Sequence, residues 1–219
     1  MAAQMIQFQR PDGAHVSGYL AQADQPLGAV VVIQEWWGLN DQIRGVAGRF
    51  ASAGFTALVP DLYRGKSTVE EEEANHLKSD LDFADAASQD IRGALQHLKG
   101  LKAGGKVGIT GYCFGGRTTW IAAHHGLGIT AASGYYGGGV PNYIDLEPKI
   151  PLEMHYGDKD KGIPLEQVEQ LKARHPAVDI YVYPGDHGFC NSDRPSNFHE
   201  AACTKASART LAFFHKHLG

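Results

Sequence analysis

The sequence predicts an α/β fold: a mainly parallel central sheet with helices on both faces and an antiparallel hairpin at the N-terminus. Apolar runs of strand length alternate with longer segments of helical periodicity, which is the order of βαβ units. Runs such as residues 29–33 are apolar throughout, so helices must cover the sheet on both sides. With 219 residues, 43% of them hydrophobic, the chain can build one full core, and we expect a single domain over residues 1–219.

The elements follow in order along the chain. In the first hairpin, Ile6 and Phe8 alternate with polar residues, residues 11–13 supply a Pro-Asp-Gly turn, and residues 15–20 return as a second strand. Buried strands are then expected at residues 29–33, 55–59, 107–109, 129–133, 150–155 and 179–183. Apolar stripes at helical spacing predict helices around residues 43–50, 84–98 and 211–218. The acidic run 70–73 is typical of a solvated helix start.

The charge balance argues against nucleic acid and membrane partners. Lys and Arg number 20 against 24 Asp and Glu, a net charge of −4, so no general attraction draws the chain to phosphate backbones or anionic lipid. The apolar runs are far shorter than the ~20 residues of a membrane helix, and the first residues lack the pattern of a secretory signal. We expect a cytoplasmic protein, a monomer or small homo-oligomer, that acts on a small molecule.

Three cysteines, Cys113, Cys190 and Cys203, are odd in number and widely spaced, which argues against a disulfide framework and predicts free thiols. Cys113 lies in the sequence Gly-Tyr-Cys-Phe-Gly-Gly, residues 111–116, between a predicted strand and a helical segment. That pattern is typical of a nucleophile elbow, which lifts the side chain clear of the sheet at a helix N-terminus and favours the thiolate. The alternative is a buried cysteine in a glycine-rich turn.

A cysteine nucleophile needs a histidine base and an acid, and an elbow predicts both downstream, the acid first. Asp160 follows the strand at 150–155 and is the predicted acid. Asp158 is its rival, and either carboxylate could instead cap a helix. His187 follows the last strand in a tight loop and is the predicted base, whereas most other histidines lie on predicted helices or in the first hairpin.

Glu35 directly follows the buried strand at 29–33. In an elbow hydrolase the loop after this strand supplies one oxyanion-hole N–H group, and the residue after the nucleophile supplies the other. The two amides would belong to Trp36 and Phe114. The alternative for Glu35 is a solvated carboxylate at a strand end.

Five motifs together resemble the dienelactone hydrolase family of α/β-hydrolases, and they occur in order along nearly the whole chain. They are Gln34-Glu35-x-x-Gly38, Gly111-Tyr112-Cys113-x-Gly115-Gly116, Gly134-Tyr135-Tyr136-Gly137, Gly157-x-x-Asp160 and Gly185-x-His187-x-Phe189. The resemblance implies an α/β-hydrolase fold and a Cys-His-Asp triad that opens an enol lactone or cleaves a related activated ester through an acyl-enzyme. It also implies that Glu35 hydrogen-bonds the resting thiol until substrate binds, and that Tyr136 lines the pocket.

One feature of the family has no match in this chain. Its best-known members bind the substrate carboxylate with two arginines, one before the elbow and one four residues past the histidine. Here the second position is Asn191, and residues 70–75 are acidic. Arg64, Arg117 or Arg194 could substitute, but the sequence places none of them in a pocket.

Two other functions fit parts of the sequence. A glutamine amidotransferase-like enzyme also has a cysteine elbow, but it usually carries a late His-x-Glu motif, where this chain has only an adjacent His199-Glu200. A non-catalytic thiol sensor or binding protein of the same fold would use Cys113 as its sensor. The sequence shows no dinucleotide fingerprint and only weak metal-ligand spacing, so we expect neither a cofactor nor a metal.

Overall fold

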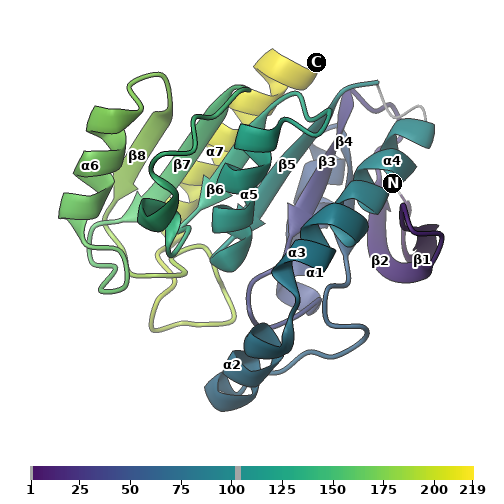
Figure 1. Ribbon diagram of the computed structural model, residues 1–219, viewed down its shortest axis with the longest axis horizontal. Helices are drawn as coiled ribbons and strands as arrows, with labels where there is room; N and C mark the ends of the chain where they lie inside the picture. Colours follow the sequence, from purple (N-terminus) through teal and green to yellow (C-terminus); the bar gives the residue numbers. More distant parts are fainter. Residues whose placement is uncertain (1, 102–104) are drawn as a thin grey trace. The chain divides into compact units, whose positions relative to one another are not determined.

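The computed structural model describes residues 2–101 and 105–219 (Figure 1). The chain divides into two compact units, Met1–Ile109 with Leu218–Gly219, and Thr110–His217. A single domain over residues 1–219 stays a prediction. Among the described residues, no helix is long and apolar enough to cross a bilayer.

The first unit opens with the predicted hairpin. Strand β1 (Ala2–Gln9) pairs antiparallel with β2 (His15–Gln22), and Gly13, at φ +89°, makes the turn between them. Strand β4 (Phe55–Pro60) pairs antiparallel with β2 and parallel with β3 (Gly28–Ile33), which gives the order β1-β2-β4-β3.

Strands β3 and β4 are buried at every position, as their apolar sequences predict. Helix α1 (Asp41–Ser52) packs on β2, β3 and β4 with the stripe that includes Ile43, Val46 and Phe50. Its first turn is capped by Asn40, whose side-chain oxygen accepts the N–H of Ile43 at 3.1 Å.

The helix expected around residues 84–98 is divided into three pieces. These are α3 (Phe83–Asp85), the π-helix η1 (Ala86–Ile91) and α4 (Arg92–Gly100), which packs on β1, β3 and β4. A π-helical turn widens the helix locally and is frequent at functional sites. Here the segment carries the buried carboxylate of Asp90.

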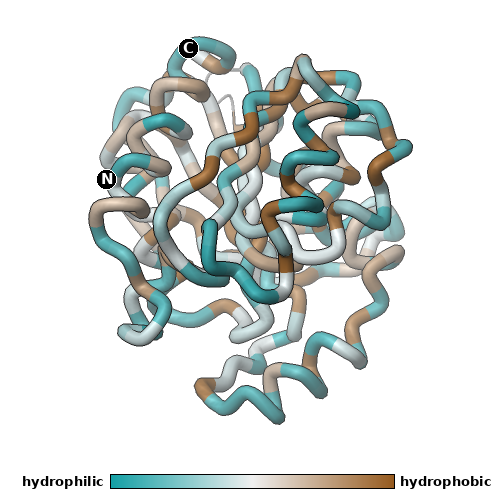
Figure 2. The backbone as a smooth tube through the Cα atoms, turned by 90° about the vertical axis from the view of Figure 1, so that its left-hand side faces the viewer, coloured by the Kyte–Doolittle hydropathy of each residue, from teal (hydrophilic) through white to brown (hydrophobic). Residues whose placement is uncertain are grey.

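Helix α2 (Glu71–Asp80) begins at the acidic run, as predicted. Only Ala74 and Leu77 are buried. Figure 2 accordingly shows α2, the helix at the bottom of the view, as mainly hydrophilic with isolated hydrophobic positions.

The second unit contains the strand order β5-β6-β7-β8, with β5 starting in the first unit. Its elements are β5 (Val107–Tyr112), α5 (Phe114–His125), β6 (Ala132–Tyr135), the short 3-10 helix η2 (Val140–Tyr143), β7 (Leu152–Gly157), α6 (Leu165–Arg174), β8 (Asp179–Tyr183) and α7 (Glu200–Leu218). Strands β6, β7 and β8 are parallel. Strand β6 begins three residues later than expected, because a turn with Leu127 and Gly128 at positive φ continues to Ile129, whose N–H binds the carbonyl of Gly126 at 2.7 Å.

Helices α5 and α7 cover opposite faces of β6. Gly134 faces α5, because a Cβ added there would meet the carbonyl of Gly116 at 3.1 Å. The neighbouring Ser133 and Tyr135 point to the other face, where their hydroxyls bond that of Thr210 in α7, each at 2.8 Å. Figure 1 shows α5 in front of these strands and α7 behind them. The predicted α/β class is confirmed, with helices on both faces.

Cys190 and Cys203 form a disulfide, so the expectation of three free thiols is wrong. Their Cα atoms lie 4.8 Å apart because the segment after β8 folds back on itself, with the N–H of His199 bound to the carbonyl of Phe189 at 3.0 Å. Spacing along the chain does not reveal that fold. In the described part of the chain, Cys113 is the free cysteine.

Candidate active site

Cys113 occupies a strained turn between β5 and α5. Its backbone has φ +57° and ψ −119°, a region that residues other than glycine rarely adopt. Gly111 and Gly116 allow the close approach, since a Cβ at Gly111 would overlap the carbonyl of Gly115, and one at Gly116 would overlap that of Tyr135. The N–H of Cys113 also binds the carbonyl of Tyr135 at 3.1 Å. This is the backbone form of a nucleophile elbow.

Three side chains in the second unit form a chain of hydrogen bonds. The thiol group of Cys113 is hydrogen-bonded to His187. On the other side of the ring, His187 Nδ1 donates to Asp160 Oδ2 at 2.7 Å, and Asp160 Oδ1 accepts the N–H of Gly162 at 2.8 Å. The Asp160 side chain is fully buried, whereas that of His187 is 37% exposed. The arrangement therefore joins a sulfur, an imidazole and a fixed carboxylate in series.

Asp158, the rival acid, has a different partner. Its Oδ1 accepts the N–H of Gly185 at 3.0 Å, and the N–H of Lys159 binds the carbonyl of Gly185 at 2.9 Å. Both bonds hold the start of the loop that carries His187. The structure thus brings Asp160, and not Asp158, to the imidazole.

The surroundings of His187 favour its protonated form. Burial alone would lower the pKa of the imidazole, but hydrogen bonds to Asp160 and Cys113, together with the charges of both groups, outweigh burial and raise the pKa to about 10. At neutral pH the ring is an imidazolium between two acceptors. Such a cation stabilises a thiolate at Cys113 and holds a proton ready for transfer.

The raised pKa predicts the alkaline limit of activity. We expect kcat/KM for ester hydrolysis to fall as the pH rises through about 10, because His187 then loses the proton it donates. Asp160→Asn removes the strongest interaction that raises this pKa, so the fall in kcat/KM at alkaline pH, the alkaline limb of the pH–rate profile, should move to lower pH. A pH–rate profile of both proteins measures the shift, with circular dichroism at each pH as the control for folding. Identical alkaline limbs would contradict this assignment.

Tyr136 lies beside the imidazole. It has φ +34° and is fully buried, with its ring centroid 5.2 Å from that of His187 and 5.5 Å from that of Phe189. The N–H of Tyr136 binds the carbonyl of His155 at 2.7 Å. This hydrogen bond holds the strained backbone of Tyr136 in place, and the Tyr136 ring packs against one side of the His187 imidazole.

Asn197 is a contact of the base that the sequence did not suggest. Its side-chain Nδ2 donates to the backbone carbonyl of His187 at 2.8 Å. Asn197 lies in an irregular segment without periodicity or motif. No sequence signal distinguishes it from other loop asparagines, and only the folded loop identifies it.

Glu35 and Trp36 belong to the first unit, at the end of β3. Glu35 follows a fully buried strand and is itself only 5% exposed, so the alternative of a solvated carboxylate is wrong. Trp36 packs edge-on against Trp37, with ring centroids 4.9 Å apart, and Lys78 Nζ lies 5.5 Å from the Trp36 ring centroid.

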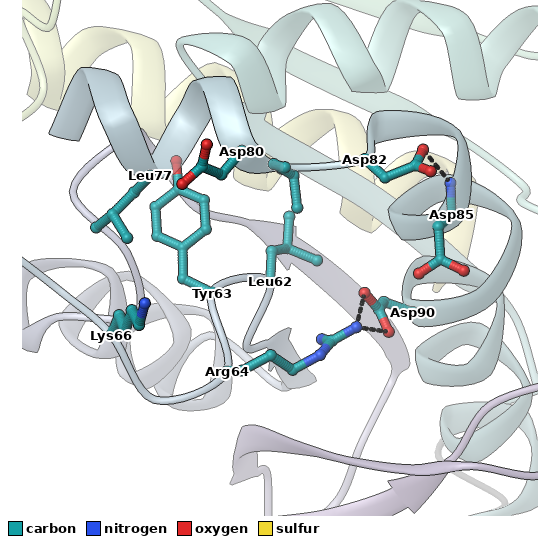
Figure 3. Close-up of a pocket in the computed structure, with 10 residues that line it drawn as sticks. Leu62, Tyr63, Arg64, Lys66, Leu77, Asp80, Asp82, Asp85 and Asp90 are labelled. Atoms are coloured by element: carbon teal, nitrogen blue, oxygen red, sulfur yellow. Dashed lines mark hydrogen bonds and ion pairs between the residues drawn. The ribbon is translucent and has the colours of Figure 1, made fainter. Parts of the chain in front are cut away.

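Arg64 is engaged within the first unit, in a cavity of about 220 Å³ (Figure 3). Its guanidinium binds both carboxylate oxygens of Asp90, at 3.0 and 2.9 Å. Burial raises the pKa of Asp90, against the opposing effect of Arg64. Leu62 and Leu77 supply apolar walls. Because the guanidinium of Arg64 is already paired with Asp90, Arg64 is a poor candidate for binding a substrate carboxylate.

Metal chemistry has no visible ligand set in the described ranges. No group of three or more His, Cys, Asp or Glu side chains there is arranged to hold an ion.

Comparison with known proteins gives one consistent result. Residues 16–218 match the model of the dienelactone hydrolase family. Carboxymethylenebutenolidase 1 of Cupriavidus pinatubonensis is 31% identical over 96% of this chain and 96% of its own length. Protein usf of Aquifex pyrophilus is 31% identical over 98% of this chain and 99% of its own. Among solved structures, dienelactone hydrolase from Anabaena variabilis superposes with a TM-score of 0.78 at 20% identity, covering 100% of this chain and 99% of that one.

Proposed function

The chain belongs to the dienelactone hydrolase family, and from that premise we propose that it is a hydrolase of small lactones or carboxylic esters with Cys113 as its nucleophile. The chemical class, carboxylic ester hydrolysis, follows from the family. The observation that carries the finer proposal is the hydrogen-bonded series Cys113–His187–Asp160 at a strained elbow.

In the first half of the reaction, the Cys113 thiolate attacks the carbonyl carbon of the ester. The carbonyl oxygen becomes an oxyanion, which backbone N–H groups stabilise most when they are held in place beforehand. Phe114 begins α5, where the positive end of the helix dipole favours a developing negative charge. As the tetrahedral intermediate collapses, the imidazolium of His187 gives its proton to the departing oxygen and a thioester forms on Cys113.

In the second half, neutral His187 takes a proton from water, which attacks the thioester carbonyl. Collapse of the second tetrahedral intermediate releases the carboxylic acid product and restores the thiolate–imidazolium pair. Asp160 orients the ring and stabilises the imidazolium in both halves of the reaction. The buried carboxylate, fixed by the Gly162 N–H, suits that role.

We assign the second oxyanion N–H to Trp36 and a regulatory role to Glu35, on their position after β3 and on the family's pattern. A carboxylate near Cys113 opposes ionisation of the thiol by like-charge repulsion, against the effect of the His187 cation. Tyr136 is proposed to line the substrate pocket, which its contact with the His187 ring supports.

Replacing Glu35 with glutamine tests its role. We expect Cys113 to react faster with iodoacetamide in Glu35→Gln than in the native protein, because a negative charge beside the thiolate is removed. Ester turnover should fall in the same variant if the carboxylate takes part in activating the thiol. The rate of alkylation is measured by mass spectrometry, from the fraction of the Cys113-containing peptide that carries the added mass at each time. An unchanged alkylation rate across pH would exclude Glu35 from this role.

The substrate is expected to need no free carboxylate. Position 191 carries asparagine, and Arg64 is paired with Asp90, so an anionic group gains little binding energy from either. For matched lactones or aryl esters with and without a carboxylate, the neutral compound should have a comparable or higher kcat/KM. A hydrolysis screen of such pairs, with Cys113→Ala as the control protein, measures this ratio. A strong preference for the anionic member would instead require another cation, such as Arg117 or Arg194, at the substrate.

Two alternatives are less well supported. For the amidotransferase-like enzyme, His199 would have to serve catalysis, but its Nδ1 accepts the N–H of Ala202 at 3.2 Å at the start of α7. A thiol sensor does not require the hydrogen bond that joins His187 to Asp160. The cytoplasmic location, the small oligomer and the absence of cofactor, nucleic acid and membrane partners stay predictions from the sequence.

A further inference from the structure

The loop that carries His187 is fastened on both sides of the histidine. Before it, Gly185 is bonded to the acid loop through Asp158 and Lys159. After it, the disulfide from Cys190 reaches Cys203, the fourth residue of α7. His187 thus lies on a short span of chain between two fixed points, and the second of them is a covalent bond only three residues away.

Helix α7 is a firm anchor for this bond. The hydroxyl of Thr210, in the middle of the helix, contacts Ser133, Tyr135, Glu153 and His155 at 2.7 to 3.1 Å. All five residues are buried. A buried polar network in which each group has partners holds its elements in one arrangement. The disulfide therefore ties the loop to a part of the second unit that is itself immobilised.

Other contacts would survive if the disulfide opened. Asn197 still donates to the His187 carbonyl, and the N–H of His199 still binds the carbonyl of Phe189. The Phe189 ring is fully buried between those of Tyr136 and Tyr183, at centroid distances of 5.5 and 5.4 Å. Opening the bond should consequently loosen the loop and leave the fold in place.

The two cysteine residues differ in exposure. Cys190 is 4% exposed, whereas Cys203, at the start of α7, is partly exposed. We therefore expect an incoming thiolate to attack from the side of Cys203. Attack from outside on one accessible sulfur is what thiol–disulfide exchange requires.

We propose that the Cys190–Cys203 disulfide is a redox-sensitive clamp, which holds the His187 loop for catalysis when closed and lowers turnover when a dithiol opens it. The proposal rests on the proposed function, since it takes His187 as the base. One thiolate of the dithiol attacks Cys203 Sγ, the S–S bond breaks, and the electron pair leaves on Cys190 Sγ, which takes up a proton. The second thiol then attacks the mixed disulfide, frees the Cys203 thiol and leaves the reductant as a cyclic disulfide, so that two electrons and two protons pass to the protein.

The first measurement establishes the state of the bond. Air-equilibrated protein is denatured, alkylated with iodoacetamide and weighed, before and after treatment with dithiothreitol. We expect one alkylated cysteine, Cys113, before reduction and three afterwards. Three alkylated cysteines in the air-equilibrated protein would overturn the proposal.

The second measurement is kinetic. Dithiothreitol is removed under nitrogen before the assay, because it would also cleave a thioester. Opening the bond should lower kcat by about three- to tenfold through misplacement of the base, with a smaller change in KM. The alkaline limb of kcat/KM should move to lower pH, because weaker contacts of His187 with Asp160 and Cys113 no longer hold its proton as strongly.

The matched control replaces both sulfurs, as Cys190→Ser with Cys203→Ser. This protein should match the reduced native enzyme in kcat and in its pH profile, and dithiothreitol pre-treatment should not change it. A disulfide that only stabilises the fold would lower the melting temperature of the control and leave kcat and the alkaline limb unchanged at 25 °C, which would overturn the proposal.

If the protein is not an ester hydrolase, the experiment gives a different result. No ester would then be hydrolysed by either redox form. The rate at which iodoacetamide modifies Cys113 in the folded protein still reports on its hydrogen bond with His187. A lower rate in the reduced form would support the clamp, and equal rates would overturn it.

Discussion

Replacing Cys113 with alanine is expected to reduce ester hydrolysis by ~10⁴-fold or more, because no other group can form the thioester. Cys113 is the free cysteine of the described chain, and it alone lies at the strained elbow with a hydrogen bond to His187. The measurement is kcat on an activated aryl ester with protein purified in parallel with the native enzyme. Full activity in Cys113→Ala would exclude a cysteine nucleophile.

Cys113→Ser is the matched variant for this experiment. The substitution keeps the size and hydrogen-bonding capacity of the side chain but replaces the thiolate with a hydroxyl that is rarely ionised. We expect a correctly folded but much slower enzyme, because the imidazolium at His187 suits a thiolate partner. Activity equal to that of the native protein would indicate that thiolate formation is not what the site provides.

Replacing His187 with alanine should lower kcat by about 10³- to 10⁴-fold, because the variant loses both the proton donor of the first step and the base of the second. Asp160→Asn should cost somewhat less, about 10²-fold or more, since the imidazole remains but its orientation and charge are no longer supported. The measurement is single-turnover and steady-state hydrolysis of the same ester.

Asp158→Asn is the internal control for the acid. Its carboxylate accepts the Gly185 N–H, a bond that an asparagine oxygen can also accept. We therefore expect a loss of less than about tenfold. A larger loss in Asp158→Asn than in Asp160→Asn would reverse the assignment of the two aspartates.

Local sequence patterns predicted most of the fold. The hairpin of β1 and β2 and the strands β3, β4 and β8 follow from alternation, apolar runs and turn residues, all of which act within a few residues. Strand β5 ends three residues later, and β7 begins two residues later, than their apolar runs predict. The late start of β6 and the π-helical turn at residues 86–91 did not follow from the sequence. The first depends on a turn with three consecutive residues at positive φ, and the second belongs to a segment whose Asp90 side chain binds Arg64, far away in sequence.

The site, too, has features that the sequence predicts and features that only the folded chain shows. The glycine spacing around Cys113 reflects a steric requirement of the turn, so the sequence alone predicts the elbow. Asp158 and Asp160 are two residues apart in one loop, and only the folded chain shows that one carboxylate faces the imidazole and the other the Gly185 N–H. The disulfide is a contact between the loop after β8 and α7, and neither the number nor the spacing of the cysteines reveals it.

If Cys113 is the nucleophile, substrate becomes covalently attached to it, and the acyl-enzyme can be trapped before water releases the product. The enzyme is mixed with excess aryl ester, quenched with acid within the first turnover and weighed intact, then digested to locate the adduct. We expect a mass increase equal to that of the acyl group, located on the peptide that contains Cys113. The adduct should persist longer in Asp160→Asn, in which deacylation is slower. Turnover without any adduct, or an adduct on another residue while Cys113 stays unmodified, would exclude Cys113 as the nucleophile.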